Sequence, residues 1–316
     1  MSSFRACVLG ASGFLGSHLV HHLLEAGCHV HAFSRVPRRN PLVTDELMSS
    51  CTVFTGDFFN AQDVERALEG CDVCFHLVST TIPKTSNDDP SRDVRENLSG
   101  ALDLLECVRR TGVRKVVYTS SGGAIYGKHL MPRISESHPT DPLCSYGIVK
   151  LAVEKYLALY HELYGIDYAA LRISNPFGPL QRAGAEQGVI GVFLGRILRN
   201  EPLHVWGDGS VVRDYIYVED VARALVLAAR MKTEHHVFNI GSGAGLSLNE
   251  IIGMMRSVTG RDVVVKYDQN RAFDVPYSVL DVSRALDELD WKASIAFDEG
   301  LRRTWEWLCH GSCETA

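Results

Sequence analysis

The feature that most constrains the fold is a glycine-rich loop close to the start of the chain. Gly10, Gly13 and Gly16 stand between an apolar, strand-like run at 4–9 and a helical stretch at 13–26. Glycine allows a sharp turn and lets backbone amides approach an anion, and the helix directs the positive end of its dipole to the same point. A strand, this loop and a helix in succession predict a site for the pyrophosphate of a dinucleotide.

The first 170 residues alternate short apolar runs with amphipathic stretches. Strands and helices are expected to alternate over the ranges 4–9, 13–26, 28–33, 51–55, 61–68, 73–77, 91–110, 113–119, 146–164 and 168–173. This alternation is typical of a parallel sheet that helices cover on both faces. We therefore predict an α/β protein with a doubly wound parallel sheet (Rossmann) over 1–174 and a smaller mixed α/β substrate lobe mainly over 175–316, some of whose segments return to the first domain.

The residues at the end of the second predicted strand determine whether such a site binds NAD or NADP. An acid here accepts hydrogen bonds from the ribose 2′-OH of NAD, whereas an arginine suits the 2′-phosphate of NADP. The chain has Ser34 and Arg35 here, then Arg38 and Arg39, and it has no acid before Asp45. Two interpretations stay open: a site that tolerates NADP, and a solvated basic loop in which Ser34 alone contacts the ribose.

Tyr146 and Lys150 form the second constellation with chemical meaning. They are four residues apart at the start of the helix predicted over 146–164, so both side chains lie on one face. A phenol titrates near pH 10 and is a poor base at neutral pH, but a nearby ammonium and a nicotinamide cation stabilise the phenolate. The pair therefore indicates acid–base chemistry beside a nicotinamide.

The charge and composition of the chain argue against several other classes of protein. With 32 basic and 38 acidic residues the net charge is −6, and no long run of Lys and Arg occurs, so nucleic acid is not an expected partner. No apolar stretch reaches the length of a membrane span, and the start, MSSFRACVLG, lacks the apolar segment of a signal peptide. The nine cysteines, Cys71 and Cys74 among them, lack zinc-site spacing and indicate reduced thiols in the cytoplasm and no metal site.

Six motifs stand in a fixed order along the chain. They are Gly10-x-x-Gly13-x-x-Gly16, Gly56-Asp57, Ser120-Ser121-Gly-Gly-Ala-Ile-Tyr-Gly127, Tyr146-x-x-x-Lys150, Leu171-Arg-Ile-Ser-Asn-Pro-Phe-Gly178 and Val212-Arg-Asp-Tyr-Ile-Tyr-Val218. With this set the chain resembles the extended short-chain dehydrogenases/reductases, in particular the NAD-dependent sugar epimerase/dehydratase family typified by UDP-glucose 4-epimerase. The resemblance covers nearly the whole chain, from Val8 to about Trp307.

The resemblance implies a cofactor site that extends beyond the glycine loop. Asp57 and Phe58 would flank the adenine, and Asn97 would lie under the ribose on the nicotinamide side. The residues expected to contact NAD, or alternatively NADP, are Gly10, Ser12, Gly13, Phe14, Leu15, Gly16, Ser34, Arg35, Asp57, Phe58, Leu77, Val78, Ser79, Asn97, Ser120, Tyr146, Lys150 and Ile173.

In the smaller lobe the resemblance implies a site for a UDP-sugar. Asn175 corresponds to the family's asparagine beside the sugar diphosphate, and Trp206 to an aromatic near the uracil. Arginine forks suit a diphosphate, and an aspartate can bind both hydroxyls of a ribose. The residues expected to contact the substrate are Ser121, Tyr146, Asn175, Gly188, Val189, His204, Trp206, Arg213, Tyr215, Arg271 and Asp274.

The chain departs from the family pattern beside the catalytic hydroxyl. Gly122 stands where many relatives carry a serine or threonine, so the hydroxyl would come from Ser121 or, failing that, Ser120. The acids that sugar 4,6-dehydratases and decarboxylating relatives use nearby are replaced by Gly123 and Ala124. Both of those reactions are therefore disfavoured.

With dehydration and decarboxylation disfavoured, the reactions that remain need only Tyr146, Lys150, a serine hydroxyl and a nicotinamide. The leading expectation is C4 epimerisation of a UDP-hexose, with or without an N-acetyl group, by oxidation at C4 and re-reduction on the other face. The alternatives are an NADP-dependent reductase of nucleotide 4-keto sugars and, in another class, a non-catalytic cofactor-sensing protein. Relatives pair through two long helices, so a homodimer is expected, although Leu151, Val153, Tyr156 and Leu157 fit an intramolecular core equally well.

Overall fold

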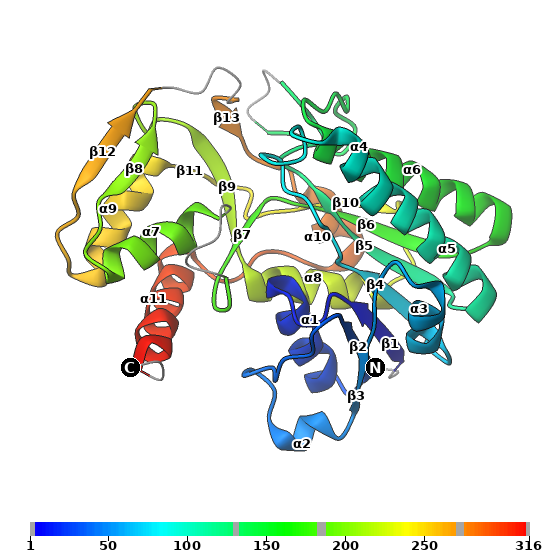
Figure 1. The fold of residues 1–316 in the computed structure, drawn as a ribbon. Coiled ribbons are helices and arrows are strands. Elements are labelled where there is room, and N and C mark those ends of the chain that lie inside the picture. Colours follow the sequence, from blue (N-terminus) through cyan, green and yellow to red (C-terminus); the bar gives the residue numbers. More distant parts are fainter. Residues whose placement is uncertain (1–3, 129–132, 182–187, 270–274, 314–316) are drawn as a thin grey trace.

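Seven parallel strands form the central sheet of the computed structural model, which describes residues 4–128, 133–181, 188–269 and 275–313 (for 311–313 the backbone only). The strand order is β10-β6-β5-β4-β1-β2-β3 (Figure 1). The bounds are β1 Arg5–Leu9, β2 His29–Ser34, β3 Cys51–Thr55, β4 Val73–His76, β5 Lys115–Ser121, β6 Asp167–Ile173 and β10 Val237–Ile240. The order reverses between β1 and β4, which opens a crevice beyond their carboxyl ends. The predicted doubly wound fold is confirmed.

Helices cover both faces of this sheet. On one face α1 and α8 pack side by side, and their apolar residues join those of β1, β2 and β6 in one core. On the other face α3, α5 and α6 share a second core with β1, β4 and β5. The helices are α1 Phe14–Glu25, α2 Asp45–Met48, α3 Ala61–Leu68, α5 Gly100–Thr111, α6 Ser145–Tyr164 and α8 Val218–Arg230.

The single helix predicted over 91–110 is interrupted. It consists of α4 (Pro90–Asp93), a π-helical turn η1 (Val94–Ser99) and α5. The wider turn changes the phase of the apolar spacing, so that Val94 is 42% exposed although the sequence pattern places it on the apolar face. π-helical turns concentrate at functional sites, and this one carries Asn97.

The second lobe is built from short strands and three helices. Strands β11, β9 and β13 form one sheet, in which β7 also pairs with β9. Strands β12 and β8 form a separate two-stranded sheet. The strands are β7 Asn175–Phe177, β8 Leu203–Trp206, β9 Val212–Tyr217, β11 Gly245–Ser247, β12 Val265–Asp268 and β13 Tyr277–Ser278. The helices are α7 Val189–Leu198, α9 Leu248–Thr259 and α11 Phe297–Cys313, whereas α10 (Ser283–Leu289) packs beside α8 and β10.

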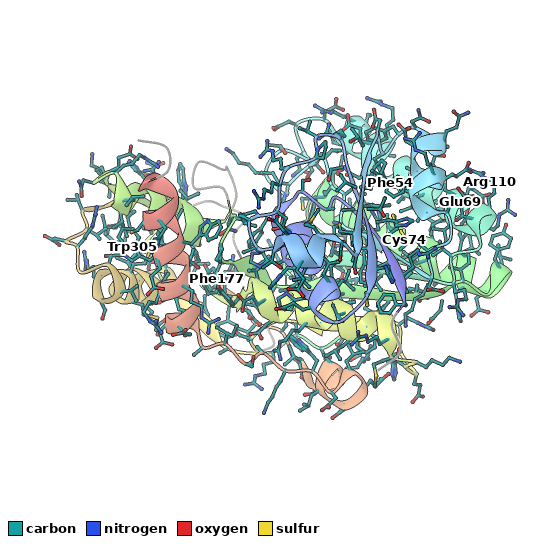
Figure 2. All side chains as sticks on the ribbon, turned by 90° about the horizontal axis from the view of Figure 1, so that it is seen from below. Phe54, Glu69, Cys74, Arg110, Phe177 and Trp305 are labelled. Carbon is teal, nitrogen blue, oxygen red and sulfur yellow. The ribbon has the colours of Figure 1, made fainter. Side chains whose placement is uncertain are left out.

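Each lobe has its own apolar interior. Figure 2 labels Phe177 and Trp305 in the smaller lobe, where Trp305 packs against the core that contains Phe177. Cys74 lies inside the larger lobe, and burial raises the pKa of its thiol, as it does for Cys71. Both thiols are therefore unreactive packing groups. No helix in the described ranges combines the length and apolarity that crossing a membrane requires.

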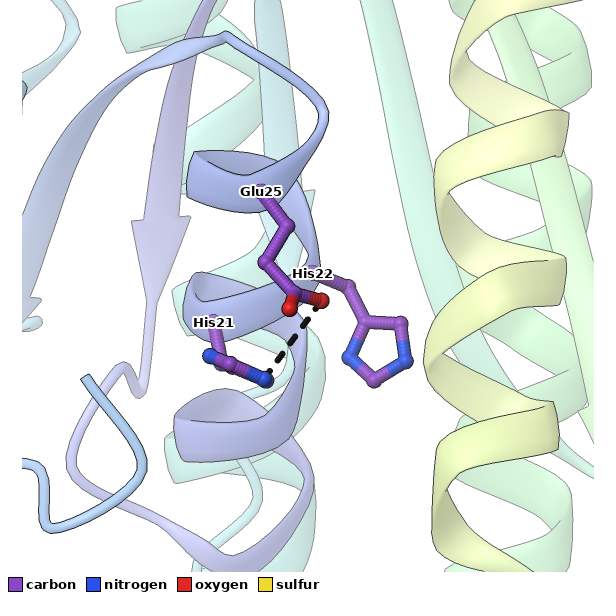
Figure 3. A group of neighbouring side chains, drawn as sticks. All are labelled: His21, His22 and Glu25. Carbon is purple, nitrogen blue, oxygen red and sulfur yellow. Dashed lines mark ion pairs between the residues drawn. The ribbon is translucent and has the colours of Figure 1, made fainter. Parts of the chain in front are cut away.

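Histidines of α1 lie where this helix meets its neighbours. Figure 3 shows His21, His22 and Glu25 on α1, with the His22 ring on the side of α8; His21 and Glu25 form an ion pair at 3.4 Å. One turn earlier, buried His18 bonds through Nε2 to the carbonyl oxygen of Pro179 at 3.0 Å and so links α1 to the smaller lobe. Burial lowers the pKa of His22, and it lowers that of His18 to about 4.

We expect acid to destabilise the protein through His18. Its pKa is near 6.5 in the unfolded chain and about 4 in the folded one, so unfolding takes up a proton between these values. The stability that neutral His18 contributes is therefore complete above pH 6.5 and is lost as the pH falls toward 4, by about 2 kcal/mol at pH 5. Urea denaturation of wild type and His18→Gln from pH 7 to pH 5 measures this slope.

The matched control is His29→Gln, because His29 is exposed on β2. This variant should keep the wild-type dependence on pH, whereas His18→Gln should reduce the loss of stability between pH 7 and pH 5 by about 2 kcal/mol. The part that remains comes from other histidines whose pKa burial lowers, such as His76 and His22. Equal slopes for the two variants would contradict the role of His18.

Candidate active site

The glycine loop forms a backbone cradle at the start of α1. Gly10 has φ +91°, and a Cβ on Gly16 would lie 2.1 Å from the carbonyl oxygen of Gly10, so only glycine fits both positions. α1 begins after Gly13 with no side-chain cap and no acid in its first turn. Its free amides and the positive end of its dipole are thus available to an anion, and the loop fits a pyrophosphate.

A cleft of about 840 Å³ runs from this loop to the smaller lobe. It unites most of the residues predicted to bind the cofactor, the sugar and the nucleotide. The predicted residues among its walls are Ser12, Gly13, Phe14, Leu15, Leu77, Ser79, Ser120, Ser121, Tyr146, Lys150, Ile173, Asn175, Gly188, Val189, Arg213 and Tyr215. In the described part of the chain, no aspartate or glutamate lines this cleft.

Tyr146 and Lys150 lie in the first turns of α6, at the floor of the cleft. The backbone N–H of Tyr146 donates to Ser86 Oγ at 3.1 Å, and Lys150 Nζ donates to the carbonyl oxygen of Thr119 at 2.8 Å. The ammonium is 5.5 Å from the centre of the Tyr146 ring and 4.7 Å from that of Tyr118. Tyr146 and Lys150 therefore share one face of α6, as their spacing predicts, and their phenol and ammonium lie close together at the cleft.

Burial favours the neutral form of each of these two groups and so moves their pKa values apart. It raises the pKa of Tyr146 to about 12, although a hydrogen bond with Ser121 lowers it. It lowers the pKa of Lys150 to about 8, against the negative charges of Glu154 and Asp93, which raise it. The two carboxylates thus help to keep Lys150 charged at neutral pH.

The two candidate serines have different partners. Ser120 Oγ donates to Glu154 Oε1 at 2.5 Å, inside a buried network in which Glu154 also pairs with Arg172 at 2.7 Å. Ser121, at the end of β5, hydrogen-bonds with Tyr146 and lines the cleft. The geometry therefore places the hydroxyl of Ser121, and not that of Ser120, beside the phenol.

Asp93 is a buried residue beside the site that sequence reasoning missed. It is fully buried, and its carboxylate accepts from Thr81 Oγ1 at 2.6 Å, from Asn97 Nδ2 at 2.8 Å and from Ser145 Oγ at 2.7 Å. One carboxylate thus joins the loop after β4, η1 and the start of α6. The signal for it was its position four residues before Asn97, on the same helical face.

The remaining predicted cofactor residues lie around the cleft but do not line it. Asn97 accepts the N–H of Thr80 at 2.9 Å, and with Val78 it lines a cavity of about 10 Å³ behind Tyr146 and Lys150, which has room for one water. Buried Phe58 stacks on His76, and exposed Asp57 accepts the N–H of Phe59 at 3.1 Å. The loop residues Gly10 and Gly16 and the basic-loop residues Ser34 and Arg35 are likewise absent from its walls.

The predicted nucleotide residues divide into two groups. Asn175 and Arg213 line the cleft, where Asn175 Nδ2 donates to the carbonyl oxygen of Asp214 at 2.7 Å. His204 and Trp206 lie outside its walls, because β8 alternates and turns Leu203 and Val205 into the core. The predictions for Arg271 and Asp274 concern residues outside the described ranges. Arg38 and Arg39, which the sequence offered only as part of a site that tolerates NADP, line the cleft. Cleft residues that the prediction left out include Ser17, Pro41, Leu180 and Gln181.

Removing the Asp93 carboxylate should destabilise the site measurably. Asp93→Ala removes the acceptor of the buried Ser145 hydroxyl and of the partly buried Thr81 hydroxyl, and one of the acceptors of Asn97 Nδ2. We expect a loss of about 3 kcal/mol in the free energy of unfolding. Urea denaturation at pH 7 measures the loss. Asp89→Ala is the control, because Asp89 caps α4 at the surface and should cost about 1 kcal/mol. Equal losses for the two variants would contradict the clamping role of Asp93.

Comparison with known proteins agrees with this geometry. The model of the family described as "NAD dependent epimerase/dehydratase family" matches residues 6–241. The UDP-glucose 4-epimerase of Mycolicibacterium smegmatis is 34% identical, over 96% of this chain and 98% of that protein.

Two solved structures have nearly the same fold. The UDP-glucose 4-epimerase of Thermotoga maritima, solved with UDP-glucose, superposes with a TM-score of 0.88 at 34% identity, covering 98% of this chain and 99% of the other. The UDP-N-acetylglucosamine 4-epimerase of Methanobrevibacter ruminantium, solved with UDP-N-acetylmuramic acid, reaches 0.90 at 31% identity, covering 98% and 100%. The glycine cradle, the Tyr146–Lys150 pair and these similarities lead to one conclusion: the chain belongs to the NAD-dependent epimerase/dehydratase family.

Proposed function

We propose that this protein is a UDP-hexose 4-epimerase. The observation that carries the proposal is the composition of the cleft: Tyr146, Ser121 and Lys150 meet at its floor, and no carboxylate lines its described walls. Dehydration and decarboxylation need a further acid or base at the sugar, which the described walls of this cleft do not offer. Reversible oxidation at C4 needs only a phenol, a hydroxyl and a nicotinamide. Similarity to the two UDP-sugar epimerases supports the same reaction.

The proposed roles of the catalytic residues follow from their partners. Tyr146 accepts the proton of the sugar O4 hydroxyl as the C4–H bond breaks, and it returns this proton when the C–H bond re-forms. Ser121 bonds the same oxygen, and charged Lys150 stabilises the phenolate. NAD, the cofactor of this family, supplies the chemistry of accepting hydride from C4 and giving it back on the opposite face. The overall reaction therefore consumes no oxidant and no reductant.

The charges of the cleft suit the rest of such a substrate. Arg213 comes from the smaller lobe and Arg38 from the loop after β2, and both line the cleft. Guanidinium groups bind diphosphates through two parallel hydrogen bonds. We propose that Arg213 and Asn175 hold the diphosphate of the UDP-sugar. A reductase of nucleotide 4-keto sugars is the second candidate, favoured by Arg35 and Arg38 in a loop without an acid before Asp45.

The first experiment is incubation of the purified protein with UDP-glucose and, separately, UDP-N-acetylglucosamine, without added cofactor. NMR should show the C4 epimer of at least one substrate, because the proposed cycle regenerates its own cofactor. Absence of both products, even after NAD⁺ is supplied, would contradict the epimerase. Consumption of NADPH with a nucleotide 4-keto sugar would then establish the reductase.

In the same assay Tyr146→Phe should lower kcat by roughly 10²–10⁴-fold, the usual contribution of a general acid–base group. Tyr156→Phe is the matched control, since Tyr156 lies on α6 but at the surface, 36% exposed. It should leave kcat unchanged. Similar losses in both variants would show that damage to α6, and not proton transfer, explains the effect.

We further propose a homodimer in the cytoplasm. Ile148, Leu159 and Leu163 form an apolar stripe along α6 with exposures of 55%, 45% and 60%, whereas Val153 and Leu157 are buried in the core. A stripe of this kind on a soluble enzyme suits burial against a second copy. The eight cysteines recorded in the described chain are free thiols, which supports a reducing compartment.

Light scattering after gel filtration should give twice the chain mass of 34.9 kDa. Leu159→Asp with Leu163→Asp should reduce it to the mass of one chain, because two buried charges would lack partners. Lys266→Glu, an exposed change on β12 in the smaller lobe, should leave the dimer intact. A monomeric wild type would overturn the proposal.

A further inference from the structure

The loop that follows β2 is folded back onto the glycine loop. Ser34, the last residue of β2, accepts the N–H of Ser12 at 3.0 Å and donates to Ser12 Oγ at 2.9 Å. The N–H of Arg38 donates to the same Ser12 Oγ at 3.4 Å. The chain between Ser34 and Arg38 therefore closes a short arc around the carboxyl end of β2. In a doubly wound fold, the ribose that carries the adenine lies at this end.

The charge of this arc is positive and partly uncompensated. Arg39 pairs with Asp45 at 3.0 Å. In the described part of the chain, the guanidinium groups of Arg35 and Arg38 have no hydrogen bond and no ion pair. Arg38 also lines the cleft next to Ser12, so its side chain belongs to the wall of the binding site and not only to the solvent.

The two acids near the end of β3, Asp57 and Asp63, have hydrogen-bond partners other than these arginines. Asp57, beyond the end of β3, already accepts the N–H of Phe59. Asp63 accepts the N–H of Asp57 at 3.0 Å and bonds Arg66 at 2.9 Å. No acid follows Ser34 before Asp45, so the carboxylate that would bind a free 2′-OH and repel a 2′-phosphate is missing. A serine hydroxyl, by contrast, can donate to a phosphate oxygen.

We propose that Ser34, Arg35 and Arg38 form a binding site for the 2′-phosphate of NADP(H), so that this protein accepts NADP(H) in addition to NAD(H). Arg38 supplies a guanidinium at the wall of the cleft, Arg35 adds a second positive charge, and Ser34 contributes a hydroxyl at the end of β2. Such a site follows from the arrangement around Ser12 and does not depend on which sugar the enzyme binds. It rests on the proposed function only in requiring a nicotinamide dinucleotide.

The test is fluorescence titration with NADPH and with NADH, at low ionic strength, of the full-length protein from which any resident dinucleotide has first been removed by charcoal treatment. We expect the two Kd values to lie within roughly tenfold of each other, because a phosphate gains charge-assisted bonds where an NAD-selective site has a repelling acid. Arg38→Ala combined with Arg35→Ala should raise the Kd for NADPH by roughly tenfold or more. It should leave the Kd for NADH within roughly twofold.

Two further variants make the result decisive. Ser34→Asp introduces the missing carboxylate and should weaken NADPH while NADH is retained. Arg199→Ala removes an arginine that pairs with Glu201 beyond α7 and should change neither Kd. Binding of NADPH more than roughly tenfold weaker than that of NADH, or equal effects of the arginine variants on both, would overturn the inference. If NADH binds and NADPH does not, the proposed epimerase still stands; if neither binds, the proposed function itself fails.

Discussion

The buried ion pair between Glu154 and Arg172 is the interaction on which the geometry of the site depends. It ties the middle of α6 to β6, and each charge is fully engaged: Glu154 also accepts from Ser120, and Arg172 Nη1 donates to the hydroxyl of Tyr126 at 2.9 Å. Removing either partner would leave an unpaired charge in an apolar interior, which costs several kcal/mol. The pair therefore allows only one placement of α6 against the sheet, and this placement sets where Tyr146 and Lys150 stand.

The same network extends toward the second lobe. The hydroxyl of Tyr126 donates to Asn239 Oδ1 at 2.6 Å, and Asn239 Nδ2 donates to the carbonyl oxygens of Ile134 and Asp281. A polar network with every member satisfied is rigid, because any shift exposes a group without a partner. The floor of the cleft and the loops that lead to the smaller lobe are thus held in one frame.

The features that were predicted well from the sequence are those whose residues lie close together in the chain. The glycine loop, the Tyr146–Lys150 pair and most strands follow from residues at most a few positions apart. The return of β10 to the edge of the first sheet depends on pairing with β6, some 65 residues away in the chain, for which no local pattern exists. The clamp at Asp93 is similar, since its three donors come from separate segments. The π-helical turn that carries Asn97 was hidden because the apolar spacing around it still suits an ordinary helix.

The distribution of charge explains how few groups the proposed chemistry needs. Asp93 and Glu154 lie behind Lys150, buried and saturated with hydrogen bonds, so they act on its charge without reaching a substrate. The polar side chains on the walls of the cleft that the structure describes are cations, hydroxyls and amides, and no carboxylate is among them. A site arranged in this way places a cation near the phenol of Tyr146 and offers further cations to a diphosphate, but its described walls offer no carboxylate to take a second proton from the sugar. In the proposed reaction, proton transfer is therefore restricted to O4 because Asp93 and Glu154 lie behind Lys150 and do not line the cleft.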